Sequence, residues 1–430
     1  MPCSTSTRNS RSTTGRWRSS ATASSPGCPP MADSPFTRID PARLRSGWGV
    51  KWGSLPQGTI GAWVADMDFG IAAPIRQQLV DWVEREDFGY PFWRGEDPVV
   101  TAFQDRMADR YGWRPEPGRT RVFTDLIQVL QVVIEHATAP GDGIALHVPT
   151  YPPFLASIAR AGRRLVPMPM RCGQDGWGFD GAGLGDRLRA AGCRMMLVVN
   201  PHNPTGRVFR RDELRLLADV AEELDLVVLS DEIHADLTYP GQQHIPFAAL
   251  GADTARRTIT ATSATKAFNI AALRCAVAHI GAPAVRAALD KAPLDYFGTP
   301  STLSRVATVA AWRDADSWLD ELMRTLTRNR DTVTDWIAAM LPDSRYHPAE
   351  GTYLAWFDLP GWRPSGSGPA AHLARVAEVA LSEGAEFSAG TTVDTTPFVR
   401  LNFATSPDNL DVVLDRISAG LRSGLAGSVR

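Results

Sequence analysis

Three polar clusters, each placed directly after a short apolar segment, are the feature that most restricts how this chain can fold. The clusters are, in chain order, Asn200-Pro-His-Asn203-Pro-Thr-Gly206, Ser230-Asp231-Glu-Ile-His234 and Ser263-Ala-Thr-Lys266. A short apolar segment bounded by turn residues is typical of a buried strand. Because ligands bind beyond the carboxyl ends of the strands in open α/β sheets, we expect the three clusters to meet in one site.

The spacing of the apolar segments predicts the fold class. Strands are expected at 144–148, 195–199, 226–229, 258–261 and 276–280. Between two of them, residues 212–224 place Leu214, Leu217, Val220, Ala221 and Leu224 on one face of a helix. Alternating strands and helices indicate an α/β fold whose mainly parallel sheet is covered on both faces.

The sequence changes character after about residue 302, which predicts a second, smaller α+β domain. There we expect a long helix at 312–340, strands at 352–357 and 399–403, and helices at 370–381 and from 408 onward. The whole chain is therefore divided into a tail (1–35), an N-terminal segment packing with the small domain (36–80), a large domain (81–305) and the small domain (306–430).

The first 32 residues differ in composition from the rest. They are rich in Ser, Thr, Arg and Pro and contain no acid before Asp33. With so few apolar groups, this stretch is predicted to be disordered. Its composition also fits an organelle transit peptide. A further alternative is that translation starts at Met31.

Composition excludes several classes of protein. The net charge of −2 gives no reason to expect nucleic acid or an anionic membrane as a partner. No apolar run reaches the roughly 18 residues that a membrane span needs. The five cysteines show no metal or redox spacing, so we expect free thiols in a reducing compartment, the cytoplasm. The histidines form no metal-ligand pattern, and GxxxxGK[ST], GxSxG and a dinucleotide GxGxxG are all absent.

The three clusters, in this order and spacing, resemble the NPxNPTG, SDEIH and SxxK signatures of fold-type I pyridoxal-5′-phosphate (PLP) enzymes, the aminotransferase class I/II family. The resemblance covers roughly Phe36 to the C-terminus. It implies the aspartate-aminotransferase fold, PLP as cofactor and a small-molecule amino acid as substrate.

The resemblance also implies roles for residues of the three clusters. Lys266 matches the lysine that holds PLP and moves the Cα proton. Asp231 matches the carboxylate that keeps the pyridine nitrogen protonated. Asn203 and His234 match hydrogen-bonding partners of the phenolic oxygen, although His234 also fits a structural histidine.

Ser263 of the third cluster and several residues outside the clusters match the remaining contacts of the family. The cofactor phosphate is expected at the backbone of Leu126 and Ile127, where a helix predicted at 125–139 begins, and at Ser263 and Arg274. Relatives often carry glycine where this chain has Asp125 and Leu126. Tyr151 matches the aromatic residue that stacks on the PLP ring.

Two further matches concern the substrate and the partner subunit. Arg400 matches the arginine that binds the substrate α-carboxylate, and Trp63 is expected to contact the substrate too. Tyr90 resembles a tyrosine that reaches the phosphate in the neighbouring subunit, which implies a homodimer with shared active sites.

Three stretches narrow the resemblance to one subgroup. The stretches 63–69 (WVADMDF), 266–270 (KAFNI) and 350–356 (EGTYLAW) resemble the cystathionine β-lyases typified by MalY and PatB. This subgroup implies β-elimination from cystathionine or another cysteine S-conjugate, giving a thiol, pyruvate and ammonia. Two alternatives remain open: an aminotransferase, possibly decarboxylating, and a PLP-binding regulatory protein, for which the chain shows no helix-turn-helix pattern.

Two positions depart from the subgroup. Arg274 is typical of aspartate-type aminotransferases, and residues 387–398 (FSAGTTVDTTPF) replace an expected glycine-rich run. Because the second stretch leads into Arg400, it predicts an altered substrate pocket. A bulky cysteine S-conjugate is the substrate that we expect from this departure.

Overall fold

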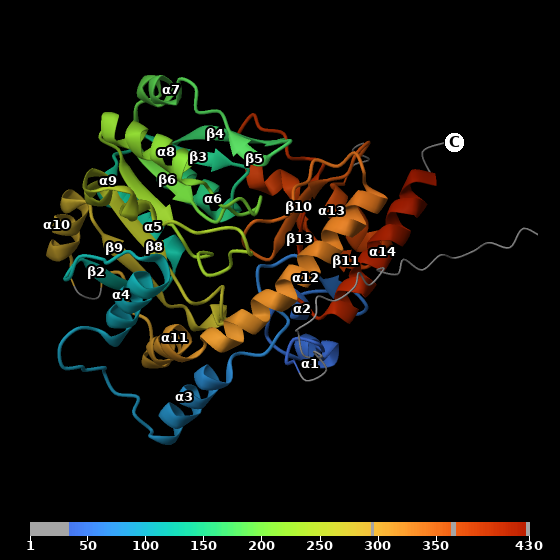
Figure 1. Ribbon diagram of the computed structural model, residues 1–430, viewed down its shortest axis with the longest axis horizontal. Helices are drawn as coiled ribbons and strands as arrows, with labels where there is room; N and C mark the ends of the chain where they lie inside the picture. Colours follow the sequence, from blue (N-terminus) through green and yellow to red (C-terminus); the bar gives the residue numbers. More distant parts are fainter. Residues whose placement is uncertain (1–33, 294–295, 363–366, 427–430) are drawn as a thin grey trace, which may run out of the picture.

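The computed structural model describes residues 34–293, 296–362 and 367–426 (Figure 1). Except for residues 34 and 35, the predicted tail lies outside the described residues. Within them, no helix combines the length and the apolar character needed to cross a membrane.

A sheet of eight strands forms the centre of the larger part of the molecule. The strand order is β2-β9-β8-β7-β6-β3-β4-β5. The strands are β2 (Thr120–Phe123), β3 (Gly143–Val148), β4 (Arg164–Gly173), β5 (Gly176–Phe179), β6 (Cys193–Val199), β7 (Val227–Asp231), β8 (Thr258–Thr262) and β9 (Ala276–Ile280). Strands β8, β7, β6, β3 and β4 run parallel, and β2, β9 and β5 pair antiparallel with their neighbours. The predicted α/β fold with a mainly parallel sheet is confirmed.

All five strands expected for this sheet are present, as β3, β6, β7, β8 and β9, but its other three strands, β2, β4 and β5, were not predicted. Strand β4 carries Pro167 and Pro169, which lack an N–H donor and argue against a central strand. The structure accommodates them because β4 pairs with β5 only over residues 170–173, so the prolines lie where β4 is an edge strand.

Alternate residues of the parallel strands enter two different cores. Ile144 and Leu146 pack with α5 (Leu126–Ala137), α6 (Pro152–Arg160) and α10 (Pro283–Lys291). Between them, Ala145 packs on the opposite face with α7 (Leu184–Ala190) and α8 (Arg211–Glu223). Since side chains alternate along a strand, helices on both faces explain why these strands are almost entirely apolar.

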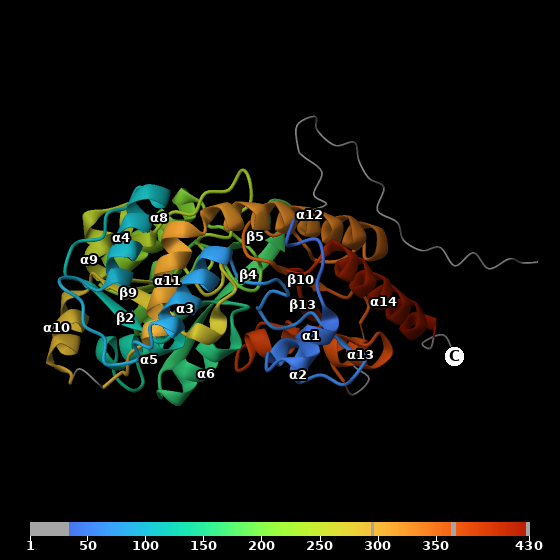
Figure 2. The same cartoon turned by 90° about the horizontal axis from the view of Figure 1, so that it is seen from below.

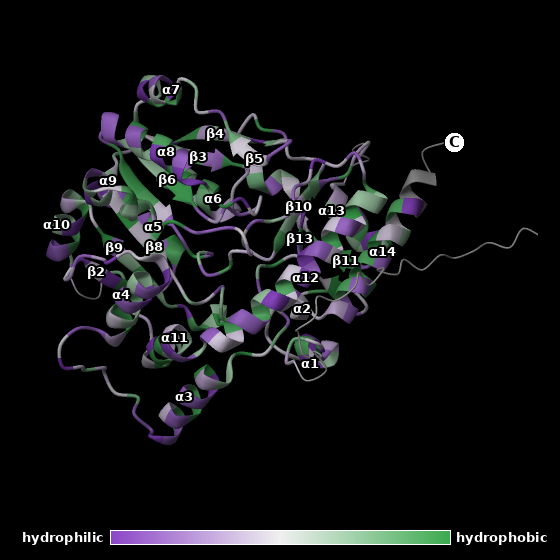
Figure 3. Cartoon of the chain, in the orientation of Figure 1, coloured by the Kyte–Doolittle hydropathy of each residue, from purple (hydrophilic) through white to green (hydrophobic). Residues whose placement is uncertain are grey.

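The remaining helices in the described residues are α1 (Pro41–Ser46), α2 (Val50–Gly53), α3 (Ala73–Glu84), α4 (Pro98–Tyr111), α9 (Ala252–Arg257), α11 (Thr302–Asp314), α12 (Asp316–Met340), α13 (Pro369–Val376) and α14 (Pro407–Ala426), with short 3-10 turns η2 (Phe247–Leu250), η3 (Ala271–Leu273) and η4 (Gly384–Ser388). Figures 1 and 2 show α12 extending from the large sheet to the smaller part of the molecule. In Figure 3, hydrophobic and hydrophilic residues alternate along α12 and α14, as expected for helices that cover a core with one face.

The smaller part is built on two short sheets. Strands β10 (Leu354–Asp358), β13 (Phe398–Asn402) and β12 (Ser382–Glu383) form an antiparallel sheet with β13 in the middle. The second sheet pairs β1 (Ile60–Gly61) in parallel with β11 (Val379–Ala380). The N-terminal segment is therefore hydrogen-bonded to the region predicted as the small domain.

Two helix predictions for this part were wrong in detail. The helix expected at 312–340 is split at Ala315, which is buried and lies between α11 and α12. The helix expected at 370–381 ends at Val376, because Glu378 adopts a positive φ of 52° and residues 379–380 form β11 instead. Burial of Val379 in the sheet outweighs its helical spacing.

The N-terminal segment divides between the two parts. Strand β1 belongs to the small part, whereas α3 packs on α11 beside the large sheet. Helix α11 also crosses residue 305, where we expected the large domain to end. The division into domains at these residues stays a prediction.

Candidate active site

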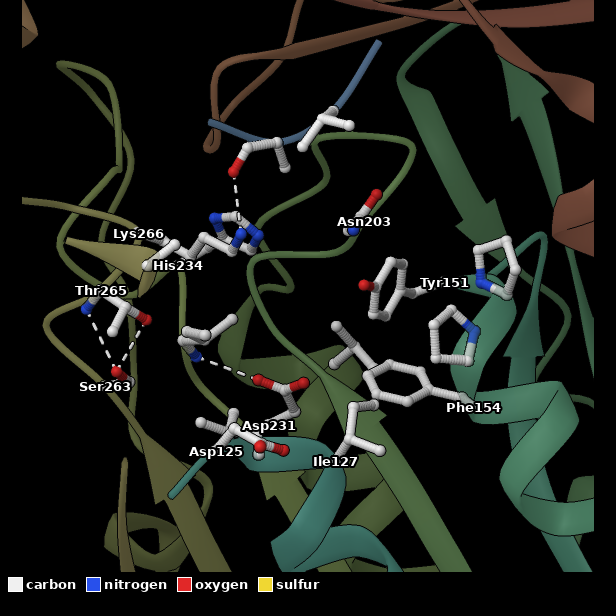
Figure 4. Close-up of a pocket in the computed structure, with 18 of the residues that line it drawn as sticks. Asp125, Ile127, Tyr151, Phe154, Asn203, Asp231, His234, Ser263, Thr265 and Lys266 are labelled. Carbon is white, nitrogen blue, oxygen red and sulfur yellow. Dashed lines mark hydrogen bonds between the residues drawn. The ribbon is translucent and has the colours of Figure 1, made fainter. Parts of the chain in front are cut away.

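A cavity of about 840 Å³ lies where the carboxyl ends of β6, β7 and β8 meet the first turns of α5 and α6. Figure 4 shows Lys266 and His234 on one side of it, and Tyr151 and Asn203 on the other. The predicted site residues that line it are Trp63, Leu126, Ile127, Tyr151, Asn203, Asp231, His234, Ser263, Lys266, Arg274 and Arg400. The topology therefore brings together all but one of the predicted residues.

Tyr90 is the exception. Its side chain is fully exposed, and it lines a separate cavity of about 560 Å³ with Trp93 and Arg305. Within a single chain, Tyr90 is therefore not part of the main cavity, and its role stays a prediction.

The amine of Lys266 points at the backbone of the N-terminal segment. Its Nζ donates a hydrogen bond of 2.8 Å to the carbonyl oxygen of Ala65. Burial lowers the pKa of the Lys266 amine, and nearby Arg400 and Arg274 act in the same direction, whereas Asp66 and Asp231 oppose them. A lowered pKa increases the share of neutral amine, which is the form that attacks carbonyl carbon and accepts a proton.

Residues 63–68, here called the 63–68 segment, are fixed by side chains from distant parts of the chain. Asn402 donates from Nδ2 to the carbonyls of Val64 and Asp66, both at 2.6 Å. Asn269 accepts from the N–H of Met67 at 3.0 Å. These bonds hold the Ala65 carbonyl in place against Lys266, and they connect the WVADMDF stretch with Asn269 of the KAFNI stretch.

Asp231 ends β7 as a buried acid. One carboxylate oxygen accepts from the N–H of Ile233 at 3.1 Å. Burial raises the pKa of the Asp231 carboxyl to about 7, and the neighbouring Glu232 adds to the increase. A buried carboxylate of this kind is stabilised by a cationic hydrogen-bond donor, such as a protonated heterocyclic nitrogen.

His234 and Asn203 lie near Lys266 and Arg400 in the same cavity. His234 is buried, burial lowers its pKa to about 3, and its Nδ1 has no hydrogen-bond partner among the described residues. It is therefore neutral at physiological pH. Asn203 accepts from Arg400 through Oδ1 at 2.9 Å, so its amide N–H₂ remains available to the cavity.

Arg400 is a buried cation at the centre of β13. Its guanidinium also donates to the carbonyl of Trp63 at 3.0 Å and to Ser382 Oγ at 3.1 Å, and it lies 4.8 Å from the ring centroid of Phe387. Burial lowers its pKa to about 10, which still leaves it charged at neutral pH. Its Nε has no partner in the described part of the chain, so the site can bind a carboxylate.

The anion site lies at the N-terminus of α5. Asp125 caps this helix through Oδ1, which accepts from Gln128 N at 2.8 Å. Its other carboxylate oxygen is ion-paired with Arg274. First-turn N–H groups, such as those of Leu126 and Ile127, are outside the helical hydrogen-bond ladder and favour an anion. Ser263 Oγ donates a hydrogen bond of 2.6 Å to the carbonyl of Cys275 and shares a hydrogen bond of 2.8 Å with Thr265 Oγ1.

Several residues that line the cavity were not predicted as site residues. They include Ala65, Gln128, Thr265, Ser382 and Glu386. The capping pair had a sequence signal, because Asp125 and Gln128 follow the D-x-x-Q pattern of a capping box. Ala65 had none, since its backbone rather than its side chain meets Lys266.

The chemical groups that line the cavity fit those of PLP. An amine, a buried acid, a helix N-terminus and an aromatic ring at Tyr151 match the aldehyde, the pyridine nitrogen, the phosphate and the ring face of that cofactor. The unpartnered Nδ1 of His234 and Nε of Arg400 indicate that the site is completed by bound groups. Among the described residues, no cluster of His, Cys, Asp or Glu could hold a metal ion.

Comparison with known proteins identifies the family. Residues 83–417 match the family model described as aminotransferase class I and II. Cystathionine β-lyase of Corynebacterium glutamicum is 33% identical over 86% of this chain and 96% of that protein. Cystathionine β-lyase PatB of Bacillus subtilis is 29% identical over 84% and 92%. The solved PLP-bound C-S lyase of Staphylococcus hominis covers 91% of this chain and 99% of its own, with a TM-score of 0.83 and 26% identity. The chain belongs to the aminotransferase class I and II family.

Proposed function

We propose that the protein is a PLP-dependent carbon–sulfur β-lyase, which cleaves cystathionine or another cysteine S-conjugate. The observation that carries this proposal is that Lys266, Asp231 and Arg400 line one cavity, with the Lys266 amine against the 63–68 segment. That segment is part of the WVADMDF stretch (63–69), which resembles the lyase subgroup. The names of the relatives from C. glutamicum and B. subtilis support the same reaction.

The roles of the side chains follow from their charges. When bound, PLP supplies an electron sink that stabilises negative charge at the substrate Cα. Arg400 binds the α-carboxylate and orients the substrate. Lys266 removes the Cα proton, the Cβ–S bond breaks, and sulfur leaves with the electron pair as a thiolate that takes up a proton. With one water consumed, the products are thiol, pyruvate and ammonia.

The same residues would serve an aminotransferase, the alternative reaction. The two outcomes are distinguished by incubating the protein and PLP with L-cystathionine and cysteine S-conjugates without a keto acid. Sustained release of pyruvate, ammonia and thiol is the expected result. Conversion of the cofactor to its amine form, reversed by a keto acid and without thiol release, would establish transamination instead.

We also propose that the protein works as a homodimer in which Tyr90 reaches the partner's active site. The loop between α3 and α4 supports this, because it exposes Phe88, Tyr90 and Phe92 although aromatic side chains are usually covered. Mixing inactive Lys266→Ala and Tyr90→Ala subunits tests it. Hybrid dimers should regain activity because one of their sites has both residues intact, whereas unchanged inactivity of the mixture would contradict shared sites.

A further inference from the structure

Glu386 is the one charged group of the cavity that the proposed reaction leaves without a role. The acidic and basic residues among the described ones that line the cavity are Asp125, Asp231, Lys266, Arg274, Arg400 and Glu386. Asp125 is ion-paired with Arg274, and Asp231 and Lys266 serve the cofactor in the proposed reaction. Arg400 takes the α-carboxylate. This leaves Glu386 as the charge not assigned to the cofactor or to the α-carboxylate, and the group on sulfur as the part of the substrate without an assigned contact.

The carboxylate of Glu386 is free to bind a ligand. It lies in η4, is exposed, and makes no hydrogen bond or ion pair with any residue that the structure describes. The turn that carries it is fixed, because Thr150 N–H donates to the carbonyl of Phe387 at 2.8 Å. Phe387 in turn lies against Arg400, so Glu386 is held near the carboxylate site, and its charge acts on that of Arg400.

The surroundings of Glu386 indicate the shape of the ligand. Turn η4 packs on α6, whose first residues Pro152, Pro153 and Phe154 form an apolar wall of the cavity. The cavity volume of about 840 Å³ lies near the upper end of the ~300–1,000 Å³ usual for small-molecule sites. This volume has to hold the cofactor together with the substrate. Next to Glu386 the site offers an apolar wall for a carbon stem and an acid for a polar end.

We propose that Glu386 selects cysteine S-conjugates whose sulfur substituent carries a positive charge beyond an apolar stem. This inference rests on the proposed lyase function. Cystathionine, whose distal end has both an ammonium and a carboxylate group, gains less from Glu386 than a substituent that ends in an ammonium group alone. Opposite charges attract across the cavity, and an anionic substituent is repelled by the same carboxylate.

The test uses three substrates of similar size and different charge. They are S-(2-aminoethyl)-L-cysteine, neutral S-propyl-L-cysteine and anionic S-(2-carboxyethyl)-L-cysteine. The kcat/KM for pyruvate and thiol release is measured on the PLP-loaded wild type, Glu386→Gln and Glu386→Lys. Glu223→Gln is the matched control, because Glu223 is an exposed glutamate on α8 that does not line the cavity.

The wild type should prefer the cationic over the anionic substrate, and Glu386→Gln should reduce that ratio by about fivefold, the upper range for exposed charge pairs. Glu386→Lys should reverse the preference, and Glu223→Gln should leave it unchanged. A wild type without preference for the cation, or a ratio unaffected by either substitution at 386, overturns the inference.

A binding measurement separates this inference from the proposed reaction. L-Lysine, L-2-aminoheptanoate and L-2-aminopimelate copy the three substrates with carbon in place of sulfur, so they cannot undergo C–S cleavage. Their Kd values are obtained from the change in cofactor absorbance. If no thiol is released from any conjugate but Kd still follows charge through Glu386, the lyase reaction fails and the selection by Glu386 stands. If thiol is released but neither Kd nor kcat/KM depends on Glu386, the lyase reaction stands and the selection by Glu386 fails.

Discussion

The Nζ of Lys266 and the carbonyl oxygen of Ala65 lie 2.8 Å apart, although 201 residues separate them in the chain. The same carbonyl accepts a hydrogen bond of 2.8 Å from Tyr353 Oη. The lysine of the SxxK cluster is therefore positioned by the backbone of the 63–68 segment. This contact links the two sequence stretches that most clearly suggest a lyase.

Replacing Lys266 with Ala should abolish the visible absorbance of covalently bound PLP and all turnover, because it removes the only amine among the described residues that line the cavity. Absorbance spectra of the purified protein with PLP check this. Lys291→Ala, which changes an exposed lysine at the end of α10, is the control and should behave like the wild type. Covalent absorbance retained in Lys266→Ala would place the attachment elsewhere.

Arg400→Lys should weaken binding of amino acids by about ten- to a hundredfold, because a bidentate guanidinium–carboxylate contact becomes a single one. The affinity for the corresponding amino-acid amides, which lack the carboxylate, should change little. Titrations of cofactor absorbance with matched acids and amides measure both. An equal loss for acids and amides would mean that Arg400 acts through the structure alone.

The cofactor-free protein should lose stability as the pH rises from about 4 to about 7, owing to Asp231. The folded protein keeps this proton up to its raised pKa of about 7, whereas the unfolded chain releases it near 3.8. The stabilisation is fully present below the unfolded pKa and is lost as the pH passes the folded one. Between pH 4 and 7, the free energy of unfolding of Asp231→Asn should rise relative to that of the wild type by up to about 4 kcal/mol. Urea unfolding of both proteins at several pH values checks the trend, and a constant difference would refute the raised pKa.

Asp125→Asn should bind PLP more tightly than the wild type. The asparagine oxygen still caps α5, but the negative charge next to the anion site is removed and Arg274 is released for the phosphate. The Kd for PLP, from absorbance titration, should fall several-fold. A weaker affinity would instead show that Asp125 positions Arg274 for the phosphate.

Asn402→Asp should destabilise the protein by about 2–4 kcal/mol, because a carboxylate replaces the donor to two partly buried carbonyls, those of Val64 and Asp66. The kcat should fall with it, since the 63–68 segment positions Lys266. Thermal unfolding and steady-state kinetics measure the two effects. As a comparison, Asn409→Asp changes an asparagine whose Nδ2 bonds to Thr405 and not to this segment, so its kcat should be preserved.

The sequence was sufficient to predict the fold class, the family and most of the cavity, for a physical reason. Buried parallel strands must be apolar, so the polar residues at their ends are conspicuous, and Asn203, Asp231 and Lys266 could be assigned to one edge of the sheet. Their individual roles stay predictions. Other features depend on long-range contacts that no residue type signals. Ala65 contributes a backbone oxygen, and β11 forms only because β1 pairs with it.

The proposed role of Glu386 could not be predicted from the sequence for a different reason. Its importance depends on which other charges in the cavity are already paired, and that balance is visible only when side chains from several elements are placed together. The role proposed for Tyr90 belongs to the proposed homodimer, and within one chain its side chain is exposed outside the main cavity.

The parallel pairing of Ile60 with Val379 has a consequence for biosynthesis. The ribosome produces β1 and the 63–68 segment early. Strand β11, which pairs with β1, and Asn402, which lies 338 positions after its partner Val64, are made much later. A nascent chain can complete the large sheet while the hydrogen bonds from Asn402 to the 63–68 segment are still missing. Retention of PLP should therefore require synthesis through β13, and a chain that stops before β13 should not retain the cofactor.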